Sequence, residues 1–223
     1  MSNDSVTTET PTPLWRRKPV LLTVFWVLLV GAMIAGTTFV RPGEEPVAGG
    51  DEVLDPAAFA AEVYEPEVVP YIEDNAVELT ELLPRIEADP DGTGEELGNR
   101  NGSSPYSYPV KVTGTVVEGE FGEAGLEVPD LGSDATVGVQ TGPVVTGTAI
   151  RDSVGFITFD QARNQIEFSN IATELNNQVK ESVLSKTDFA SLLGKQITVV
   201  GAFTYDDPAH VTITPVEIGT GNE

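Results

Sequence analysis

An uncharged run near the N-terminus constrains the fold of this chain more than any other feature. Residues 19–40 read PVLLTVFWVLLVGAMIAGTTFV, 22 residues without Asp, Glu, Lys or Arg. A helix of that length, rising about 1.5 Å per residue, crosses a hydrocarbon core of about 30 Å. Residues 16–18 are all basic, whereas acidic residues outnumber Arg41 after the run, so the positive-inside rule places the N-terminus in the cytoplasm. We predict a cytoplasmic tail over residues 1–18 and a transmembrane signal-anchor helix over 19–40.

The alternative interpretation of this run is a cleaved secretory signal peptide. The apolar core of a signal peptide is normally shorter, and no small-x-small cleavage site stands clearly at the end of the run. Residues 41–54 mix Pro, Gly and Glu, a composition typical of a flexible linker. The rest of the chain is therefore predicted to be the extracytoplasmic domain of a single-pass protein of the cell membrane.

The outer part of the chain is strongly acidic, and the sequence lacks cysteine. From residue 41 onward, nine Lys and Arg stand against 33 Asp and Glu. Such a charge repels nucleic acid, because a nucleic-acid binder needs cationic groups to replace phosphate counterions. The acidity suits either a solvated surface or a site for a cationic partner. Without Cys there is no thiolate nucleophile or lipidated cysteine, and one His is too few for a His-rich metal site. We expect no nucleic-acid partner, metal or cofactor.

A first helix is predicted directly after the linker. The pair Asp55-Pro56 is typical of a helix start, since the Asp carboxylate can cap first-turn N–H groups and Pro fits the first turn. The helix runs through Tyr64, after which Pro66 and Pro70 interrupt the helical pattern.

A second helix and a long loop complete the segment before the first strand. Residues 89–109 are rich in Gly, Asn, Ser and Pro and are predicted to be an ordered loop or connector. Residues 55–108 are thus predicted to be a helical annex with its loop. The second helix, ending near residue 89, is indicated by apolar residues spaced three or four apart: Ile72, Ala76, Leu79, Leu83 and Ile86.

The pattern then changes to that of β-strands. Residues 110–117 alternate apolar with polar side chains. An amphipathic helix is indicated over residues 166–183, and two strands close the chain across a turn at residues 206–208. Two or three more short strands fit the residues between the first strand and this helix: 125–128, 135–140 and 144–150.

Three strands, one helix and two strands is the element order of the five-stranded OB-fold barrel. We therefore predict a mainly β domain with α-helices, in which residues 109–218 form an OB-fold-like barrel with a helix between strands 3 and 4. Closing a barrel removes exposed strand edges, and the helix over residues 171–184 is expected to plug one end. Other folds share this element order.

No motif indicates an enzyme. The sequence has no Walker loop, dinucleotide fingerprint, Gly-x-Ser-x-Gly elbow or His-Glu-x-x-His helix. His210, beside the predicted last turn, is either a surface residue or a general base without a supporting motif. Carboxylates are so numerous that their spacing does not identify a glycosidase pair. Asp89, Asp91 and Glu95 fit a calcium loop poorly, because Gly92 comes too early.

The segment over residues 150–168 is the strongest candidate for a ligand site. Arg151 can bind a carboxylate through two hydrogen bonds, and Asn164 and Gln165 can each donate and accept. Three Phe side chains could stack against a sugar-like ligand. The structural alternative is that Arg151 forms an internal ion pair with Asp152, Asn164 caps a helix and the Phe residues belong to the core.

This part of the sequence resembles a known family. GPVVTGTAIRDSVGFITFDQARNQIEFSNIATELN (residues 142–176), with VVPYIEDNAVEL and SPYSYPVKVTGTV before it, is similar to a bacterial family of unknown function described as predicted periplasmic lipoproteins. The resemblance covers about residues 55–216. It implies an OB-like barrel and an association with ABC-type sugar uptake systems, and no established activity. The polar residues that match the family are our candidate ligand-binding residues: Arg151, Asp152, Asn164, Gln165, Glu167 and Asn176.

The chain departs from this family at its attachment to the membrane. Members typically carry a lipidated Cys after a signal peptide, whereas this sequence has no Cys, so a helix would replace the lipid as tether. We predict a membrane-tethered, extracytoplasmic, non-enzymatic accessory protein that binds a small polar ligand or components of an ABC sugar transporter. The alternative is an envelope structural or assembly module without a small-molecule site, and an enzyme acting on carbohydrate is a third hypothesis.

Overall fold

The computed structural model describes residues 22–23, 25–30, 54–119 and 122–220. The chain separates into two compact units, residues 1–47 and 48–223. In the first unit, residues 22–23 and 25–30 are helical. The predicted tail, most of the predicted transmembrane segment and most of the predicted linker lie outside the described residues. Among the residues that are described, no helix combines the length and the apolar character needed to cross a membrane.

The second unit begins with the predicted first helix, which ends within one residue of the predicted end at Tyr64. Helix α2 (Pro56–Val63) is capped by Asp55, whose carboxylate accepts the N–H groups of Ala57 and Ala58. The chain then continues through a π-helical segment, η2 (Tyr64–Val68), into α3 (Val69–Asn75). The predicted interruption of the α-helical pattern around Pro66 is confirmed, and it takes the form of a π-helical segment instead of a break in the helical chain. In the π turn the Val69 N–H bonds the Tyr64 carbonyl five residues back. This wider turn lets the helical chain continue past a proline, which has no backbone N–H to donate.

The predicted second helix is divided into two. A short strand, β1 (Val77–Glu78), separates α3 from α4 (Leu79–Ala88), because Val77 pairs with Val110 in a parallel ladder. The predicted loop after it contains another helix, α5 (Pro90–Leu97), whose N-cap is Asp89. Two glycines lower the helix propensity of α5, but a Cβ on Gly94 would overlap the ring of Tyr106. Glycine is thus what lets this helix pack closely on the strand side.

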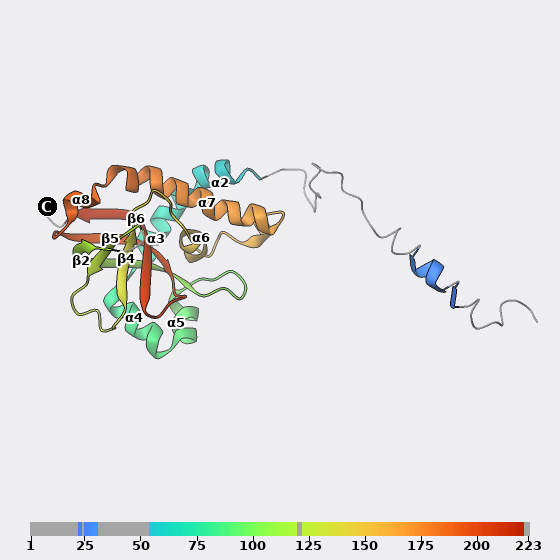
Figure 1. Ribbon diagram of the computed structural model, residues 1–223, viewed down its shortest axis with the longest axis horizontal. Helices are drawn as coiled ribbons and strands as arrows, with labels where there is room; N and C mark the ends of the chain where they lie inside the picture. The colour runs from blue at the N-terminus through green and yellow to red at the C-terminus, as the bar shows by residue number, and fades with distance from the viewer. Residues whose placement is uncertain (1–21, 24, 31–53, 120–121, 221–223) are drawn as a thin grey trace, which may run out of the picture. The chain divides into compact units, whose positions relative to one another are not determined.

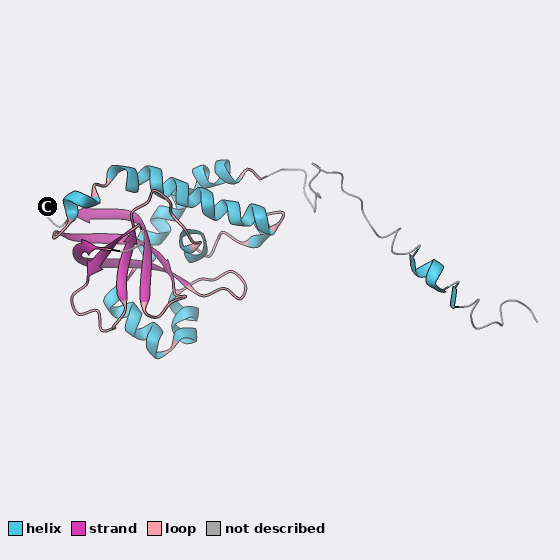
Figure 2. Cartoon of the chain, viewed as in Figure 1, coloured by secondary structure: helices cyan, strands magenta, loops and turns pink. Residues whose placement is uncertain are grey.

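Five strands pair in a closed circuit. They are β2 (Ser107–Glu118), β3 (Glu123–Glu127), β4 (Thr136–Gln140), β5 (Gln196–Thr204) and β6 (His210–Thr220). β2 pairs with β3, β3 with β4, β4 with β6, β6 with β5, and β5 again with β2. Figures 1 and 2 show the strands gathered together beside the helices of this unit. The predicted order of three strands, a helical segment and two strands is confirmed. One range was wrong: residues 144–148 form a loop, and residues 149–150 begin helix α6 (Ala149–Ser153).

The reason for that error is visible in the side chains. Val144 is 72% exposed, whereas Ile150 is fully buried. Gln140, at the end of β4, holds the loop through both polar atoms of its side-chain amide. Its Nε2 donates to the Thr146 carbonyl, and its Oε1 accepts the Thr146 N–H. The buried apolar residues of this range, Ala149 and Ile150, are therefore placed by the start of helix α6, not by the alternation of a strand.

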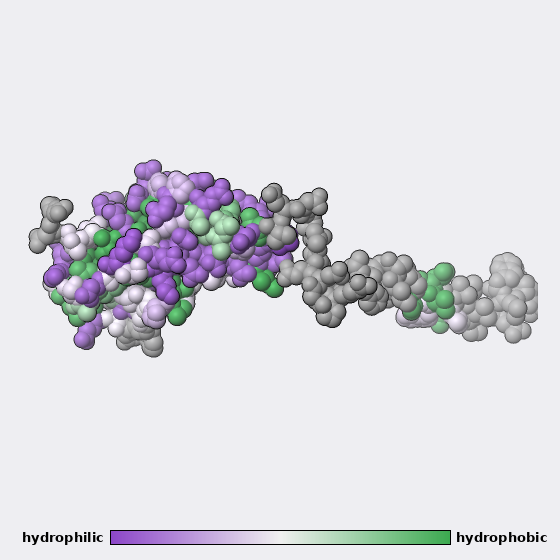
Figure 3. All heavy atoms as spheres, turned by 90° about the horizontal axis from the view of Figure 1, so that it is seen from above, coloured by the Kyte–Doolittle hydropathy of each residue, from purple (hydrophilic) through white to green (hydrophobic). Residues whose placement is uncertain are grey.

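Two apolar cores lie in the second unit. The first is enclosed by the strands and receives α4, whose Leu79, Leu82, Leu83 and Ile86 are fully buried. The second lies between α2, α3 and the long helix α7 (Gln165–Ser182) and includes residues of β5 and β6. The long helix thus does not plug the strand core as predicted; α4 contributes to that core instead. A 3-10 turn, η3 (Phe159–Gln161), precedes α7, and η4 (Leu184–Lys186) and α8 (Phe189–Leu192) follow it. The face seen in Figure 3 is mainly hydrophilic, in keeping with the acidic composition.

Candidate functional site

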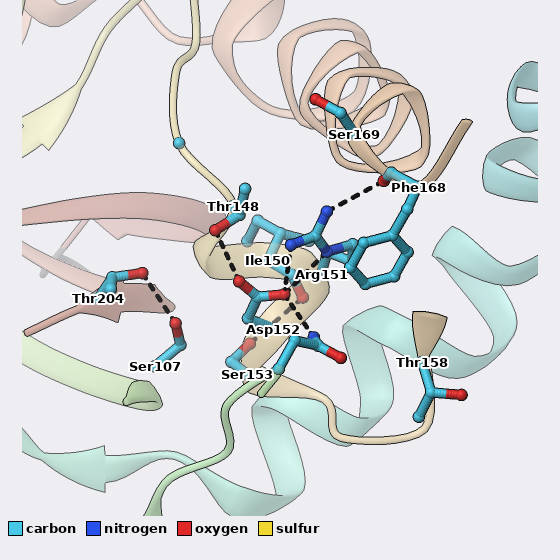
Figure 4. Close-up of polar contacts among 12 residues, drawn as sticks. Ser107, Thr148, Ile150, Arg151, Asp152, Ser153, Thr158, Phe168, Ser169 and Thr204 are labelled. Atoms are coloured by element: carbon cyan, nitrogen blue, oxygen red, sulfur yellow. Dashed lines mark hydrogen bonds and ion pairs between the residues drawn. The ribbon is translucent and has the colours of Figure 1, made fainter. Parts of the chain in front are cut away.

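Arg151 and Asp152, the centre of the predicted ligand site, form a buried ion pair. Helix α6 carries both side chains, which are 7% and 3% exposed. Arg151 Nε donates to Asp152 Oδ1 at 2.8 Å, and Nη1 donates to the Phe168 carbonyl at 3.0 Å. The guanidinium carbon lies 3.7 Å from the centre of the Phe168 ring. Figure 4 shows the Arg151 side chain directed from α6 toward α7.

Protein groups also satisfy the rest of the Asp152 carboxylate. Asn101 Nδ2 donates to Oδ1 at 2.7 Å, and Thr148 Oγ1 donates to Oδ2 at 2.6 Å. Beside them, Asn99 Nδ2 donates to the Ser153 carbonyl at 2.7 Å. The pair therefore ties the chain before β2 to α6 and, through Arg151, to α7. This is the geometry that the structural alternative expected, and ligand binding at this pair stays a prediction.

Asn164 and Glu167 form a separate network at the start of α7. Asn164 caps the helix by accepting the Glu167 N–H at 2.9 Å. Glu167 Oε2 accepts from the Arg163 backbone N–H at 3.1 Å and from its Nε at 2.9 Å. Oε1 of the same carboxylate is buried without a hydrogen-bond partner among the described residues.

The two remaining predicted residues are also on α7, Gln165 at its first position and Asn176 further along. Asn176 is buried and donates to the Gly147 carbonyl at 2.9 Å, whereas Gln165 is exposed. Of the three predicted Phe side chains, Phe168 lies under Arg151 with Phe159 at its edge, and Phe156 packs against Tyr71. The six predicted residues thus contribute to several local contacts instead of surrounding one cavity.

A groove elsewhere on the molecule has the room that this cluster lacks. Its volume is about 860 Å³, and it lies over β3 and β4, between the end of β2 and the turn that joins β5 to β6. Gly125 of β3 and Gly138 of β4 are directly paired in its floor. A Cβ on Gly138 would overlap the carboxylate of Glu123. The missing side chain therefore lets Glu123 lie across β4 toward β6.

A carboxylate, an imidazole and a hydroxyl that line this groove form one network with a second hydroxyl, that of Thr212, beside it. Glu123 Oε2 lies 2.8 Å from His210 Nε2, and Thr212 Oγ1 donates to Glu123 Oε1 at 2.9 Å. The other imidazole nitrogen, Nδ1, lies 2.7 Å from Thr136 Oγ1. The side chains of His210 and Glu123 are 39% and 16% exposed. Both ring nitrogens and both carboxylate oxygens are thus oriented by the fold.

The groove is negatively charged. Glu118, Glu123, Glu127 and Asp207 line it, and no Lys or Arg is among the described residues that do so. Within the described part of the chain, Glu118 and Glu127 have no hydrogen bond or ion pair through their side chains, whereas Asp207 accepts the Ala209 N–H at 2.8 Å. Like charges repel in such a cleft, so the groove disfavours anionic ligands.

This site was not predicted from the sequence. Glu123 and His210 are 87 residues apart and Thr136 and His210 are 74 residues apart, and no local pattern connects them. Gly125 and Gly138 were the available signal, since glycine within a strand marks a bulge or a close approach.

The fold and the groove define the class of this protein. It is an OB-fold domain with added helices, and the groove lies over β3 and β4, the second and third strands of the circuit. The chain belongs to the predicted periplasmic lipoprotein family (DUF2291), which it matches over residues 27–219. The resemblance noted from the sequence is confirmed, and the family description implies a membrane-associated, extracytoplasmic domain.

A solved structure supports the fold independently. An OB-fold protein from Thermotoga maritima superposes with a TM-score of 0.58, covering 76% of this chain and 99% of the other, at 20% sequence identity. At that identity the likeness shows the fold alone. No curated protein matches the sequence.

Proposed function

We propose that the protein is a binding module outside the cytoplasm, tethered to the membrane by a helix over residues 19–40 with its N-terminus in the cytoplasm. It binds a small polar ligand in the groove over β3 and β4 and acts as an accessory of an ABC-type sugar uptake system. The groove is the observation that best supports this proposal. Its volume of about 860 Å³ falls within the usual range of ligand pockets, roughly 300–1,000 Å³.

Orientation of polar groups in the groove also supports ligand binding. The network of Glu123, His210, Thr136 and Thr212 fixes several polar atoms beside an open floor of backbone. Fixed polar groups on an otherwise apolar wall are what gives small-molecule sites their specificity. At Arg151 and Asp152, by contrast, a ligand would have to displace bonds that the protein already makes.

A ligand screen with two matched variants tests this proposal. Thermal unfolding of the full chain in detergent is followed with mono- and oligosaccharides, amino sugars and sugar acids, since a ligand that binds only the folded state raises its stability. Gly138→Leu fills the groove floor, with Gly138→Ala as a smaller change, and Arg151→Lys keeps the charge at the other candidate site. We expect a saturable rise in Tm that Gly138→Leu abolishes and Arg151→Lys retains, with circular dichroism showing that both variants fold.

Two other outcomes would contradict ligand binding in the groove. A rise lost in Arg151→Lys and kept in Gly138→Leu would move the site to α6. A flat screen would favour the second candidate function, an envelope structural or assembly module. That candidate is supported by the burial of Arg151 and Asp152, which join separate segments of the domain as a structural element would.

A further inference from the structure

The groove has carboxylates at both ends. Glu118 stands where β2 ends, and Glu127 is the last residue of β3. Glu123 and Glu127 project from the same side of β3 and are four residues apart, about 13 Å at the rise of a strand. Of the two strand carboxylates, Glu123 is held by His210 and Thr212, whereas Glu127 has no hydrogen bond or ion pair among the described residues.

The surface between these carboxylates is the floor formed by the paired glycines, Gly125 and Gly138, which leave backbone exposed there. Leu126 and Val137, which alternate with these glycines along their strands, point to the other face and belong to the strand core. Such a surface accepts the C–H face of a ring or a short aliphatic chain. A ligand that is polar at its ends and less polar in its middle matches this distribution.

From this arrangement we infer that the groove takes a ligand carrying a protonated amine, whose ammonium group lies at Glu127 or Glu118. The inference rests on the proposed function and gives the chemical class of its ligand. A cation replaces water at carboxylates that have no protein partner, while an acidic ligand meets only like charges. The inferred ligand group is therefore positively charged, whereas the ligand that Arg151 would favour is a negatively charged carboxylate.

The probes distinguish two kinds of ligand that carry an amine. Glucosamine carries the amine on a sugar ring, and putrescine carries it on an aliphatic chain. Glucose and glucuronic acid are the neutral and anionic counterparts of glucosamine. Binding of each to the full chain in detergent is measured by calorimetry at low and high salt. The tested variants are Glu118→Gln and Glu127→Gln, and Glu95→Gln on α5, outside the groove lining, is the control for the general negative field.

We expect an amine to bind about tenfold more tightly than glucose at low salt. High salt should reduce this preference because it screens the charges. Glucuronic acid should bind most weakly. Glu118→Gln or Glu127→Gln should remove most of the preference and Glu95→Gln none of it. Equal binding of glucosamine and glucose, or a preference that survives both variants, would overturn the amine assignment and leave the groove proposal standing. Failure of every probe to bind would count against both. Tighter binding of glucosamine than of putrescine would identify the ring as part of the recognised ligand.

Discussion

Replacing Asp152 with alanine is expected to lower the free energy of unfolding by about 3–5 kcal/mol, the usual cost of removing one partner of a buried ion pair. The charge of Arg151, on a side chain only 7% exposed, would be left without its counter-ion. Asn101 and Thr148 would also lose the acceptor of their hydrogen bonds. Most of the expected loss of stability therefore comes from buried polar groups left without a partner, and less from the lost attraction between the two charges.

The measurement is denaturant unfolding of the full chain in detergent, followed by circular dichroism. Glu78→Ala is the matched control, because Glu78 pairs with Lys111 at 3.6 Å with both side chains about half exposed, and such pairs contribute roughly 0–1 kcal/mol. If Asp152→Ala cost no more than this control, the buried pair would not be a stabilising element. Binding would then be the better explanation of its presence.

Phe203→Ala is expected to be as damaging, with a loss of about 3–5 kcal/mol. Phe203 is fully buried, and its ring stacks on that of Tyr108 with centroids 5.5 Å apart. The two residues are register partners in the β2–β5 ladder that closes the circuit of strands. Removing the ring leaves a cavity in the strand core and loses the contact across the ladder.

Leu193→Ala is the control for this substitution. Leu193 is 48% exposed, and surface truncations of this kind usually change stability by less than about 0.5 kcal/mol. Denaturant midpoints of the two variants give the comparison. Similar losses in both would contradict the assignment of Phe203 to the core of the domain.

Local patterns in the sequence predicted the elements whose signals are strong. Asp55 before Pro56 correctly marked the start of α2, and the apolar stripe over residues 166–183 predicted α7 almost to its ends. The alternation in residues 110–117 likewise predicted β2. In each case capping or periodicity agrees with the burial that the fold imposes.

The errors arose where tertiary contacts override local preference. Helix α5 forms in a Gly-rich stretch because Gly94 packs on Tyr106. Helix α3 ends before Leu79 because Val77 pairs with Val110, 33 residues further along the chain. Residues 144–150 have the composition of a strand, but Gln140 holds residues 144–148 as a loop. None of these contacts is visible in a window of sequence.

The candidate sites differ in how far the sequence could predict them. The segment around Arg151 was predicted from the sequence as a ligand site, and the structure shows the polar groups of Arg151 and Asp152 bonded to the protein itself. The groove depends on strand register, which pairs Gly125 with Gly138 and brings Glu123 to His210. Register is set by the whole sheet, so these partners could not be predicted from spacing.

The most direct test of ligand binding in the groove uses the single histidine of the sequence. In the full chain labelled with ¹³C and ¹⁵N only in histidine, every imidazole signal belongs to His210 and needs no assignment. The chain is titrated with the compound that gives the largest rise in Tm. We expect the imidazole signals to shift to saturation with the calorimetric Kd, and to stay unchanged in Gly138→Leu. Binding seen by calorimetry while the wild-type imidazole signals do not move would place the ligand elsewhere and contradict the proposed site.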